Sequence, residues 1–305
     1  MRPTLVYLLA TSYSGSTLLT YLLAQHSKIS TIGELKAPSM GDIDVYRCAC
    51  GELIRTCEFW QAVTEDCVQN GTDFSVDNFD TVLDAPGSFA TRILKARVRT
   101  PAFEALRQLA IRVYPGLSRR LQTQLQRNFA LSQAVCRCAN GPVFVDGSKD
   151  STRLMHFINS GLWNVRVVFM KRDGRAVMNS FKKHRKTDAE AATERWIGTT
   201  RELQRMRARL SDSEVLDLKY EDMCAAPQQE ITRIWEWLGL DSEPLNEKDF
   251  KSGDFHLLGN AMRLTSVGEI RTDTSWQDKL TDAEKTHFEQ HAGALNRQLG
   301  YGDPS

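Results

Sequence analysis

Two strongly apolar segments, each followed by a polar loop and a helical pattern, constrain the fold of this chain more than any other feature. Residues 4–10 read TLVYLLA and residues 165–171 read VRVVFMK. Apolar runs of this length are typical of parallel strands covered on both faces. The loop TSYSGST and a leucine stripe over about 16–25 follow the first run, and RDGR and a helical pattern over about 174–184 follow the second. This alternation predicts an α/β fold.

Further segments repeat the alternation. The sequence predicts strands at 143–146 and 215–220, and helices over about 150–160, 190–210 and 231–240. Strands that alternate with helices form a parallel sheet with helices on both faces. We therefore expect a P-loop-like three-layer fold with a central parallel sheet flanked by helices.

Two regions depart from this pattern. Residues 67–140 contain helical patterns punctuated by Pro101 and Pro115, and they predict a helical insertion that covers the site or builds an interface. Residues 250–280 show no clear periodicity and predict a long ordered loop, a feature that is often functional. Because the 305 residues contain no repeat and no long linker, we expect a single domain over 1–305.

Composition excludes several function classes. A net charge of +1 provides no general attraction to nucleic acid or anionic membranes, so any anion site is local. No apolar run approaches the roughly 20 residues of a membrane span, and the polar TSYSGST argues against a signal peptide. Seven cysteines, an odd number, argue against a secreted disulfide framework. We expect a cytoplasmic protein of unknown oligomeric state.

The loop after the first strand is a candidate anion site. A helix start presents backbone N–H groups and the positive end of the helix dipole. Gly15 allows a phosphate to approach the backbone closely, and Ser14, Ser16 and Thr17 add hydroxyl groups. The Walker pattern is not met, because the loop has no lysine. Taken alone, the loop also fits a helix start capped by Ser or Thr.

Arg172 and Ser180 form a second candidate. Arg172 follows the 165–171 strand, and Ser180 lies about two helical turns into the next helix. Parallel sheets bind ligands at the carboxyl ends of their strands, and an arginine fork with a hydroxyl suits a phosphate monoester. Two such loops suggest a ligand with two phosphate groups. In the alternative interpretation Arg172 and Asp173 form a structural ion pair and Ser180 is an ordinary helix residue.

In these motifs and their order the chain resembles the sulfotransferases that use 3′-phosphoadenosine-5′-phosphosulfate (PAPS). YSGST resembles the family's 5′-phosphosulfate loop, and RDGRAVMNS resembles its R-x7-S motif for the 3′-phosphate. VFVDGSK, LKYEDM and IWEWLGL resemble later family segments, and HLLGNAMR with EIRTDTSWQDKL resembles the closing stretch of the bacterial, tyrosylprotein-like branch. The resemblance covers nearly the whole chain except 67–140.

The resemblance implies roles for individual residues. The 3′-phosphate would contact Arg172 and Ser180, and Arg263 would lie on the phosphate side of the cofactor, in a loop that covers it. The 5′ end would be held by Tyr13, Ser14, Gly15, Ser16, Thr17 and Leu18. Since Tyr13 stands where the family often has Lys or Arg, Lys149 is our candidate for the missing cation. Glu34, in GELK, matches the glutamate that serves as base in the tyrosylprotein-like branch. No metal is obligatory for this chemistry.

Other residues leave alternatives open. His26, His156 and His256 are alternative bases, although a lone histidine is more often structural. Trp276 could stack on adenine but fits a core tryptophan better, and Arg271 lies in the same closing loop as Arg263. The stretch RCACGELIRTCEFW, with Cys67 ten residues later, could hold zinc, form a local disulfide or carry free thiols.

The sequence therefore predicts an enzyme that moves the sulfuryl group of PAPS to a hydroxyl or amine acceptor and releases 3′,5′-phosphoadenosine. The acceptor, a small molecule, peptide or sugar, is not predicted. Two alternatives are a P-loop-type nucleotide phosphotransferase and a non-catalytic nucleotide-binding protein with the same fold. The loop without a lysine argues against the first, and the second would follow if chemistry had been lost with Tyr13.

Overall fold

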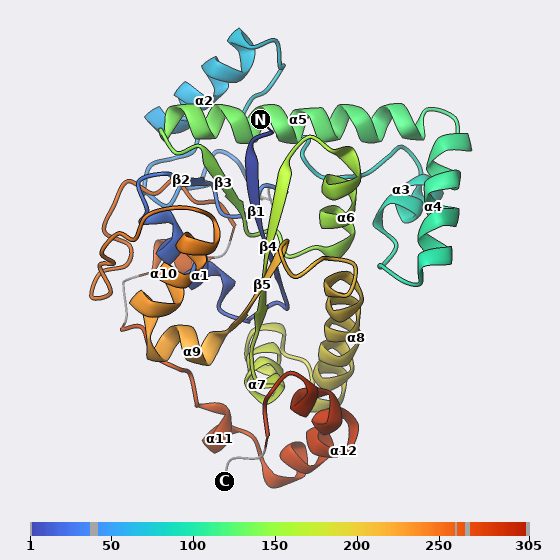
Figure 1. Ribbon diagram of the computed structural model, residues 1–305, viewed down its shortest axis with the longest axis vertical. Helices are drawn as coiled ribbons and strands as arrows, with labels where there is room; N and C mark the ends of the chain where they lie inside the picture. Colours follow the sequence, from blue (N-terminus) through green and yellow to red (C-terminus); the bar gives the residue numbers. More distant parts are fainter. Residues whose placement is uncertain (1, 37–41, 260, 266–268, 303–305) are drawn as a thin grey trace.

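The computed structural model describes residues 2–36, 42–259, 261–265 and 269–302, and its core is a parallel five-stranded sheet (Figure 1). The strand order is β2-β3-β1-β4-β5, and every paired neighbour is parallel. The strands are β1 Thr4–Ala10, β2 Ile29–Thr31, β3 Val143–Asp146, β4 Asn164–Lys171 and β5 Val215–Lys219. The predicted fold class is confirmed.

The helices follow the strands in the expected alternation. They are α1 Ser16–Ala24, α2 Glu58–Gln69, α3 Ser88–Lys95, α4 Pro101–Val113, α5 Leu117–Cys138, α6 Ser151–Ser160, α7 Gly174–Arg185, α8 Ala189–Arg207, α9 Tyr220–Ala225, α10 Pro227–Trp237, α11 Trp276–Lys279 and α12 Asp282–Gln298, with a 3-10 turn at Ala261–Leu264. Most predicted elements agree with these bounds to within a few residues.

The differences have local causes. Strand β2 was not predicted, because three residues are too few to show a periodicity. Tyr220 begins α9 instead of ending the preceding strand, and α10 begins at Pro227, a residue that suits the first position of a helix. Helix α12, which begins with a capping box at Thr281 and Glu284, was also not predicted.

Alternating side chains of β1 pack against two different helical layers. Leu5, Tyr7 and Leu9 belong to a core shared with α5 and α6, whereas Val6 and Leu8 belong to a core shared with α1, α9 and α10. All five side chains are fully buried, and burial of such a side chain stabilises the fold by roughly 1.5–3 kcal/mol. This two-sided burial explains why the sequence of β1 reads as continuously apolar.

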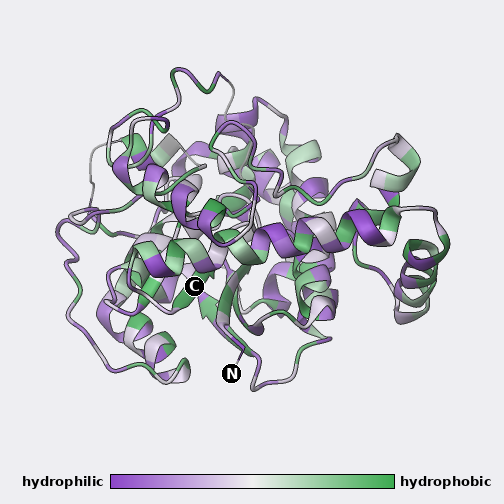
Figure 2. Ribbon diagram, turned by 90° about the horizontal axis from the view of Figure 1, so that it is seen from above, coloured by the Kyte–Doolittle hydropathy of each residue, from purple (hydrophilic) through white to green (hydrophobic). Residues whose placement is uncertain are grey.

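The helices of the region 67–140 lie around one long helix. Helix α5 packs against α2, β2 and β3, and α3 and α4 extend beyond it to one side (Figure 1). Helix α5, the long helix that crosses the centre of Figure 2, carries both hydrophilic and hydrophobic residues, as expected for a helix with one buried face. Its buried side chains include Leu121, Leu125, Asn128 and Leu131, spaced three or four residues apart.

The strand register brings the loops after four strands to one edge of the sheet. Ala10 pairs with Met170, Tyr7 with Asp146, and Thr31 with Val145. The chain therefore leaves β1, β2, β3 and β4 at neighbouring positions, which is where parallel α/β sheets form ligand sites.

No helix in the described part of the chain combines the length and the apolar composition that crossing a bilayer requires.

Candidate functional site

The loop between β1 and α1 is shaped by Gly15. This residue is the N-cap of α1, has a φ of 89° and makes no side-chain capping hydrogen bond. A Cβ atom at this position would lie 2.4 Å from the Tyr220 ring, so both the backbone conformation and the close contact require glycine. The first N–H groups of α1 have no side-chain cap and lie beside a cavity lined by Gly15, Ser16 and Thr17. This geometry favours the anion-site interpretation over a Ser- or Thr-capped helix.

Ser14 differs from its neighbours in the loop. Its side chain is fully buried and is not among the groups that line the cavity, and its Oγ has no hydrogen-bond partner among the described residues. Ser14 therefore does not face the cavity, whereas Tyr13, Ser16, Thr17 and Leu18 all line it.

Arg172 connects the end of β4 to the loop after β1. Its guanidinium donates to the Tyr13 carbonyl at 2.6 Å and to Asp273 Oδ2 at 3.2 Å, and it lies 4.3 Å from the centre of the Tyr220 ring. The side chain is 7% exposed, and its Nε has no hydrogen-bond partner among the described residues. The alternative interpretation, an ion pair with Asp173, is not found among these contacts, because Asp173 pairs with Arg175 instead. Arg172 therefore lines the cavity, and its ion pair is with Asp273 of the C-terminal loop rather than with its neighbour Asp173.

The Arg172 partner Asp273 belongs to the C-terminal loop. Partial burial by itself would raise the pKa of the Asp273 carboxyl, but hydrogen bonds from Ser275 and the charge of Arg172 together lower it. Burial also raises the pKa of the Tyr220 phenol above its usual value, so this ring is a neutral wall of the site. Asp273 thus remains an anion that holds Arg172 in place.

Ser180 reaches the same cavity from α7. Its hydroxyl donates to the Ala176 carbonyl at 3.0 Å, and its side chain is 9% exposed. The Tyr13 ring stacks on His184 of the same helix, with centroids 5.3 Å apart and planes 14° apart. Helix α7 therefore supplies one wall of the cavity and fixes the orientation of Tyr13. Tyr13 stands where the family that the sequence resembles often has Lys or Arg.

Asp146, at the end of β3, organises the two loops that carry Glu34 and Lys149. One oxygen of its fully buried carboxylate accepts hydrogen bonds from Leu35 N at 3.0 Å, Ser148 N at 2.9 Å and Ser148 Oγ at 2.5 Å. Asp146 was not among the predicted site residues. Its position at a strand end, in VFVDGSK, was the only available signal.

Glu34 and Lys149 form an ion pair across these two loops. Lys149 Nζ lies 2.7 Å from Glu34 Oε1 and also donates to the Gly147 carbonyl at 3.0 Å. Lys36 Nζ lies 3.6 Å from the other oxygen of Glu34. The two side chains of the pair are 18% and 16% exposed, respectively, and both line the cavity. The structure thus brings the two residues predicted to be catalytic to the same place.

The cavity that these groups share has a volume of about 690 Å³. This size suits a nucleotide-sized ligand. Charged groups from several elements line its wall, and the cationic side chains are Lys36, Lys149, Arg172, Arg185 and Arg271. Glu34, Glu269 and Asp273 add carboxylates, and Tyr46, Phe250, Met262 and Ile270 add an apolar part.

Several lining residues were not predicted as site residues. Lys36, Arg185 and Tyr220 lie next to predicted motifs, but single charges or rings beside a motif carry no signal of their own. The C-terminal loop contributes Gly259, Ile270 and Arg271 to the wall. Asn260 and residues 266–268 of that loop lie outside the described residues.

Arg263 lies beside a smaller hollow, not the main cavity. Its guanidinium donates to the carbonyls of Arg47 and Gly259 and packs 4.5 Å from the centre of the Tyr46 ring. The hollow, about 20 Å³ in volume, is shared with Ser16, Thr17, Lys149 and others. Arg263 is thus close to the loop predicted to bind phosphate, and the contacts above join it to backbone carbonyls and to the Tyr46 ring.

The alternative bases and the tryptophan lie elsewhere. His156 Nε2 donates to the Leu94 carbonyl at 3.0 Å, and burial lowers the pKa of this histidine to about 4. His26 bonds the Asp241 carbonyl, and His256 lies against cysteines. Trp276 packs in the core with α7 and α12 and carries Arg175 over its ring. None of the four is among the residues that line the cavity.

A larger hollow of about 1050 Å³ lies along α5. It is bordered by residues of α4 and α5 and by Asn159, Ser160 and Leu162, which lead into the start of β4. It therefore lies towards the amino ends of the strands, away from the loops at their carboxyl ends. The residues of 67–140 line this hollow and contribute none of the described lining of the 690 Å³ cavity.

Comparison with known proteins agrees with this architecture. Two solved structures cover most of this chain: a sulfotransferase domain from the Synechococcus PCC 7002 olefin synthase and one from the curacin biosynthetic pathway. The first has a TM-score of 0.50 and 18% sequence identity, and the match covers 99% of this chain and 96% of the Synechococcus chain. The second has a TM-score of 0.52 and 17% identity, with all of both chains covered. At these identities the likeness supports the fold alone.

A search of curated proteins found no match. A family model described as "Sulfotransferase family" matches residues 60–244, which is more than half of the 305 residues. The matched segment contains β3, Lys149, β4, Arg172 and Ser180. The alternative of a phosphotransferase is not favoured by this result. The chain belongs to the sulfotransferase family.

Proposed function

We propose that this protein transfers a sulfuryl group from PAPS to a hydroxyl or amine acceptor and releases 3′,5′-phosphoadenosine. The main support is the convergence of two anion sites, the loop 13–18 and the pair Arg172 and Ser180, on one cavity with Lys149 and Glu34. Membership of the sulfotransferase family supports the same reaction class.

The two anion sites fit the two phosphate ends of the donor. The uncapped start of α1 would receive the 5′-phosphosulfate, because Gly15 leaves no side chain between the backbone and the cavity. Arg172, with Ser180, would receive the 3′-phosphate. The buried Nε of Arg172 without a partner fits a guanidinium that is completed by an anion.

Lys149 would supply the cation that Tyr13 does not. In sulfuryl transfer, as in phosphoryl transfer, negative charge develops on the leaving oxygen and needs fixed positive groups. Lys149 is largely buried, and its Nζ is held by Glu34 and the Gly147 carbonyl. Lys36 lies close enough to the same carboxylate to share this role. Arg263, beside Ser16 and Thr17, would act on the phosphate side.

Glu34 would act as the base, as in the tyrosylprotein-like branch that the sequence resembles. The acceptor oxygen or nitrogen forms a bond to sulfur, the bond between sulfur and the phosphate oxygen breaks, and the leaving phosphate keeps that electron pair. The acceptor proton passes to Glu34. The apolar part of the cavity, formed by Tyr46, Phe250, Met262 and Ile270, would contact the acceptor.

The experiment that tests the proposal compares the melting temperature of the protein with 3′,5′-phosphoadenosine and with ATP plus Mg²⁺. A ligand that binds only the folded state at about 100 times its Kd stabilises it by roughly 2.7 kcal/mol. We expect stabilisation by the bisphosphate in the wild type and a loss of that effect in Arg172→Ala.

Arg166→Ala is the matched control, because Arg166 lies near the start of β4, the strand that Arg172 follows, and donates to the Ser213 carbonyl. This variant should keep the bisphosphate response. Stabilisation by ATP and Mg²⁺ alone would refute the proposed donor. Bisphosphate binding without turnover on any hydroxyl or amine acceptor would instead support the non-catalytic alternative.

A further inference from the structure

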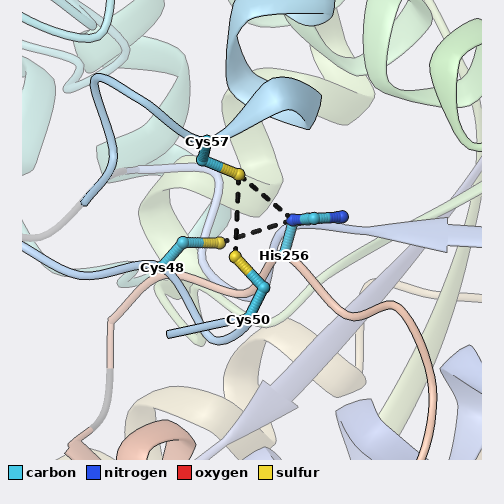
Figure 3. A group of neighbouring side chains, drawn as sticks. All are labelled: Cys48, Cys50, Cys57 and His256. Carbon is cyan, nitrogen blue, oxygen red and sulfur yellow. Dashed lines mark hydrogen bonds between the residues drawn. The ribbon is translucent and has the colours of Figure 1, made fainter. Parts of the chain in front are cut away.

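Three cysteines and one histidine, far apart in sequence, converge on a single point (Figure 3). Cys48 and Cys50 come from the loop before α2, Cys57 is the N-cap of α2, and His256 comes from the C-terminal loop. Their three Sγ atoms and one ring nitrogen all lie within 4.8 Å of one another. Cys48 and Cys57 are buried, His256 is half-buried and Cys50 is exposed.

The distances within this cluster match a tetrahedral metal site. Cys50 Sγ lies 3.7 Å from Cys57 Sγ, and His256 Nδ1 lies 3.4 Å from Cys57 Sγ and 3.6 Å from Cys48 Sγ. Zinc bonds of about 2.3 Å to sulfur and about 2.0 Å to nitrogen, arranged tetrahedrally, place two sulfurs about 3.8 Å apart and a sulfur and a nitrogen about 3.6 Å apart. The cluster already has this shape.

The histidine is also oriented as a metal ligand. Its other ring nitrogen, Nε2, lies 2.8 Å from Asp254 Oδ1. A carboxylate on the far nitrogen fixes the tautomer that leaves Nδ1 free to bind a metal, and it raises the basicity of the ligand. The imidazole is further held by stacking on Phe59 of α2, with centroids 4.2 Å apart and planes 1° apart.

We propose that Cys48, Cys50, Cys57 and His256 bind a structural Zn²⁺ ion. Three thiolates and one imidazole are a soft donor set that suits zinc rather than magnesium or calcium. Four protein ligands complete the tetrahedron and leave no open position for a substrate, so the ion is structural rather than catalytic. Each thiol gives up its proton on binding, and the ion contributes to folding stability.

The ion would join two segments that border the donor cavity. The segment 46–57 already contacts the C-terminal loop through the Tyr46 hydroxyl, which is bonded to Gly259 N at 3.0 Å, and through Arg263 and the Arg47 carbonyl. Gly259 and Met262, a few residues after His256, line the 690 Å³ cavity. Zinc at this point would hold the C-terminal loop against α2, just before the residues of that loop that line the cavity.

The cysteine spacing left zinc, a local disulfide and free thiols open, and Cys67 was included in the zinc pattern. In the structure all seven cysteines are thiols, and Cys67 is not a member of the cluster. The fourth ligand is His256, which lies about 200 residues from the cysteines and could not be recognised from their spacing. A disulfide between Cys50 and Cys57 remains the chemical competitor of the metal site.

The test measures zinc in the purified protein, expressed with zinc in the medium and kept reduced, by inductively coupled plasma mass spectrometry. We expect about one zinc per chain in the wild type and at least a tenfold lower content in Cys50→Ser and His256→Gln. Cys138→Ser is the matched control, because Cys138 is half-buried and outside the cluster; it should keep its zinc.

A second measurement does not depend on variants that fold. Replacement of zinc by Co²⁺ in the wild type should produce the intense visible absorption of a tetrahedral site and a sulfur-to-metal charge-transfer band, and a chelator should lower the melting temperature. Zinc-free wild type, or zinc that persists equally in Cys50→Ser and His256→Gln, would overturn the proposal. A Cys50–Cys57 disulfide in the freshly purified, unreduced protein, detected by mass spectrometry, would do the same.

Discussion

Lys149 Nζ lies 2.7 Å from Glu34 Oε1, so the candidate cation and the candidate base of this sulfotransferase are bonded to each other. The two residues come from loops after neighbouring strands, β3 and β2, and Asp146 holds both loops with a single carboxylate oxygen. The pair fixes the position of both groups before any ligand arrives. Such pre-organisation removes part of the cost of ordering side chains in the transition state.

If Glu34 is the base, Glu34→Gln removes the proton acceptor and keeps the shape and an acceptor oxygen for Lys149. We expect kcat to fall by roughly 10²–10⁴-fold, with unchanged affinity for 3′,5′-phosphoadenosine. The measurement is initial-rate kinetics on a sulfated hydroxyl acceptor together with calorimetric binding. Glu269→Gln, at an exposed carboxylate of the same cavity, is the control and should be nearly as active as the wild type. Equal losses in both variants would argue against a specific role for Glu34.

Lys149→Gln should reduce kcat by about 10²–10³-fold, because one fixed positive group near the leaving oxygen is lost. Lys36→Gln, at the more exposed lysine 3.6 Å from Glu34, should have a smaller effect. Single-turnover rates at saturating donor separate this effect from product release. A larger loss in Lys36→Gln than in Lys149→Gln would transfer the role of the cation to Lys36.

Gly15→Ala should destabilise the protein more than Gly116→Ala. Both glycines are N-caps in the left-handed conformation, with φ of 89° and 74°, so both variants carry the backbone strain of roughly 1–2 kcal/mol. Only at Gly15 does the new Cβ meet another group, the Tyr220 ring at 2.4 Å, whereas nothing lies within 4 Å at Gly116. Urea unfolding of both variants measures the difference. Equal destabilisation would mean that the Tyr220 ring moves away without cost.

His156 makes the stability of the fold depend on pH. Burial lowers its pKa from 6.5 to about 4, so the folded state binds fewer protons than the unfolded state between these values. The free energy of unfolding therefore decreases as the pH falls below 6.5, by up to about 1.4 kcal/mol per pH unit from this group until pH 4 is reached. Above pH 6.5 the group is neutral in both states and has no effect.

His156→Gln tests this dependence, because glutamine can still donate to the Leu94 carbonyl but does not titrate. Urea unfolding at pH 7 and pH 5 should show a smaller loss of stability in the variant than in the wild type. Other groups that titrate in this range contribute equally to both proteins, so identical losses would show that His156 is already accessible to protons in the folded state.

The sheet and most of its helices could be predicted because each is a local pattern. The apolar run of β1, the β-branched run of β4 and the leucine stripe of α1 each contain enough residues to show their period. Strand β2 has three residues and shows none. Its place at the edge of the sheet depends on pairing with β3, a contact more than 100 residues away in sequence.

The same distinction holds for the site. The sequence by itself determined which motifs could bind anions, since the Ser-Gly loop and the Arg172–Ser180 spacing are local properties of strand ends and helix starts. Only the tertiary structure decided that Ser14 is fully buried and that Lys149 pairs with Glu34. It also decided that Asp146 bonds to both loops that carry this pair. It likewise brought His256 to three cysteines that precede it by about 200 residues. Such contacts depend on how strands pair and layers pack, and no local pattern encodes them.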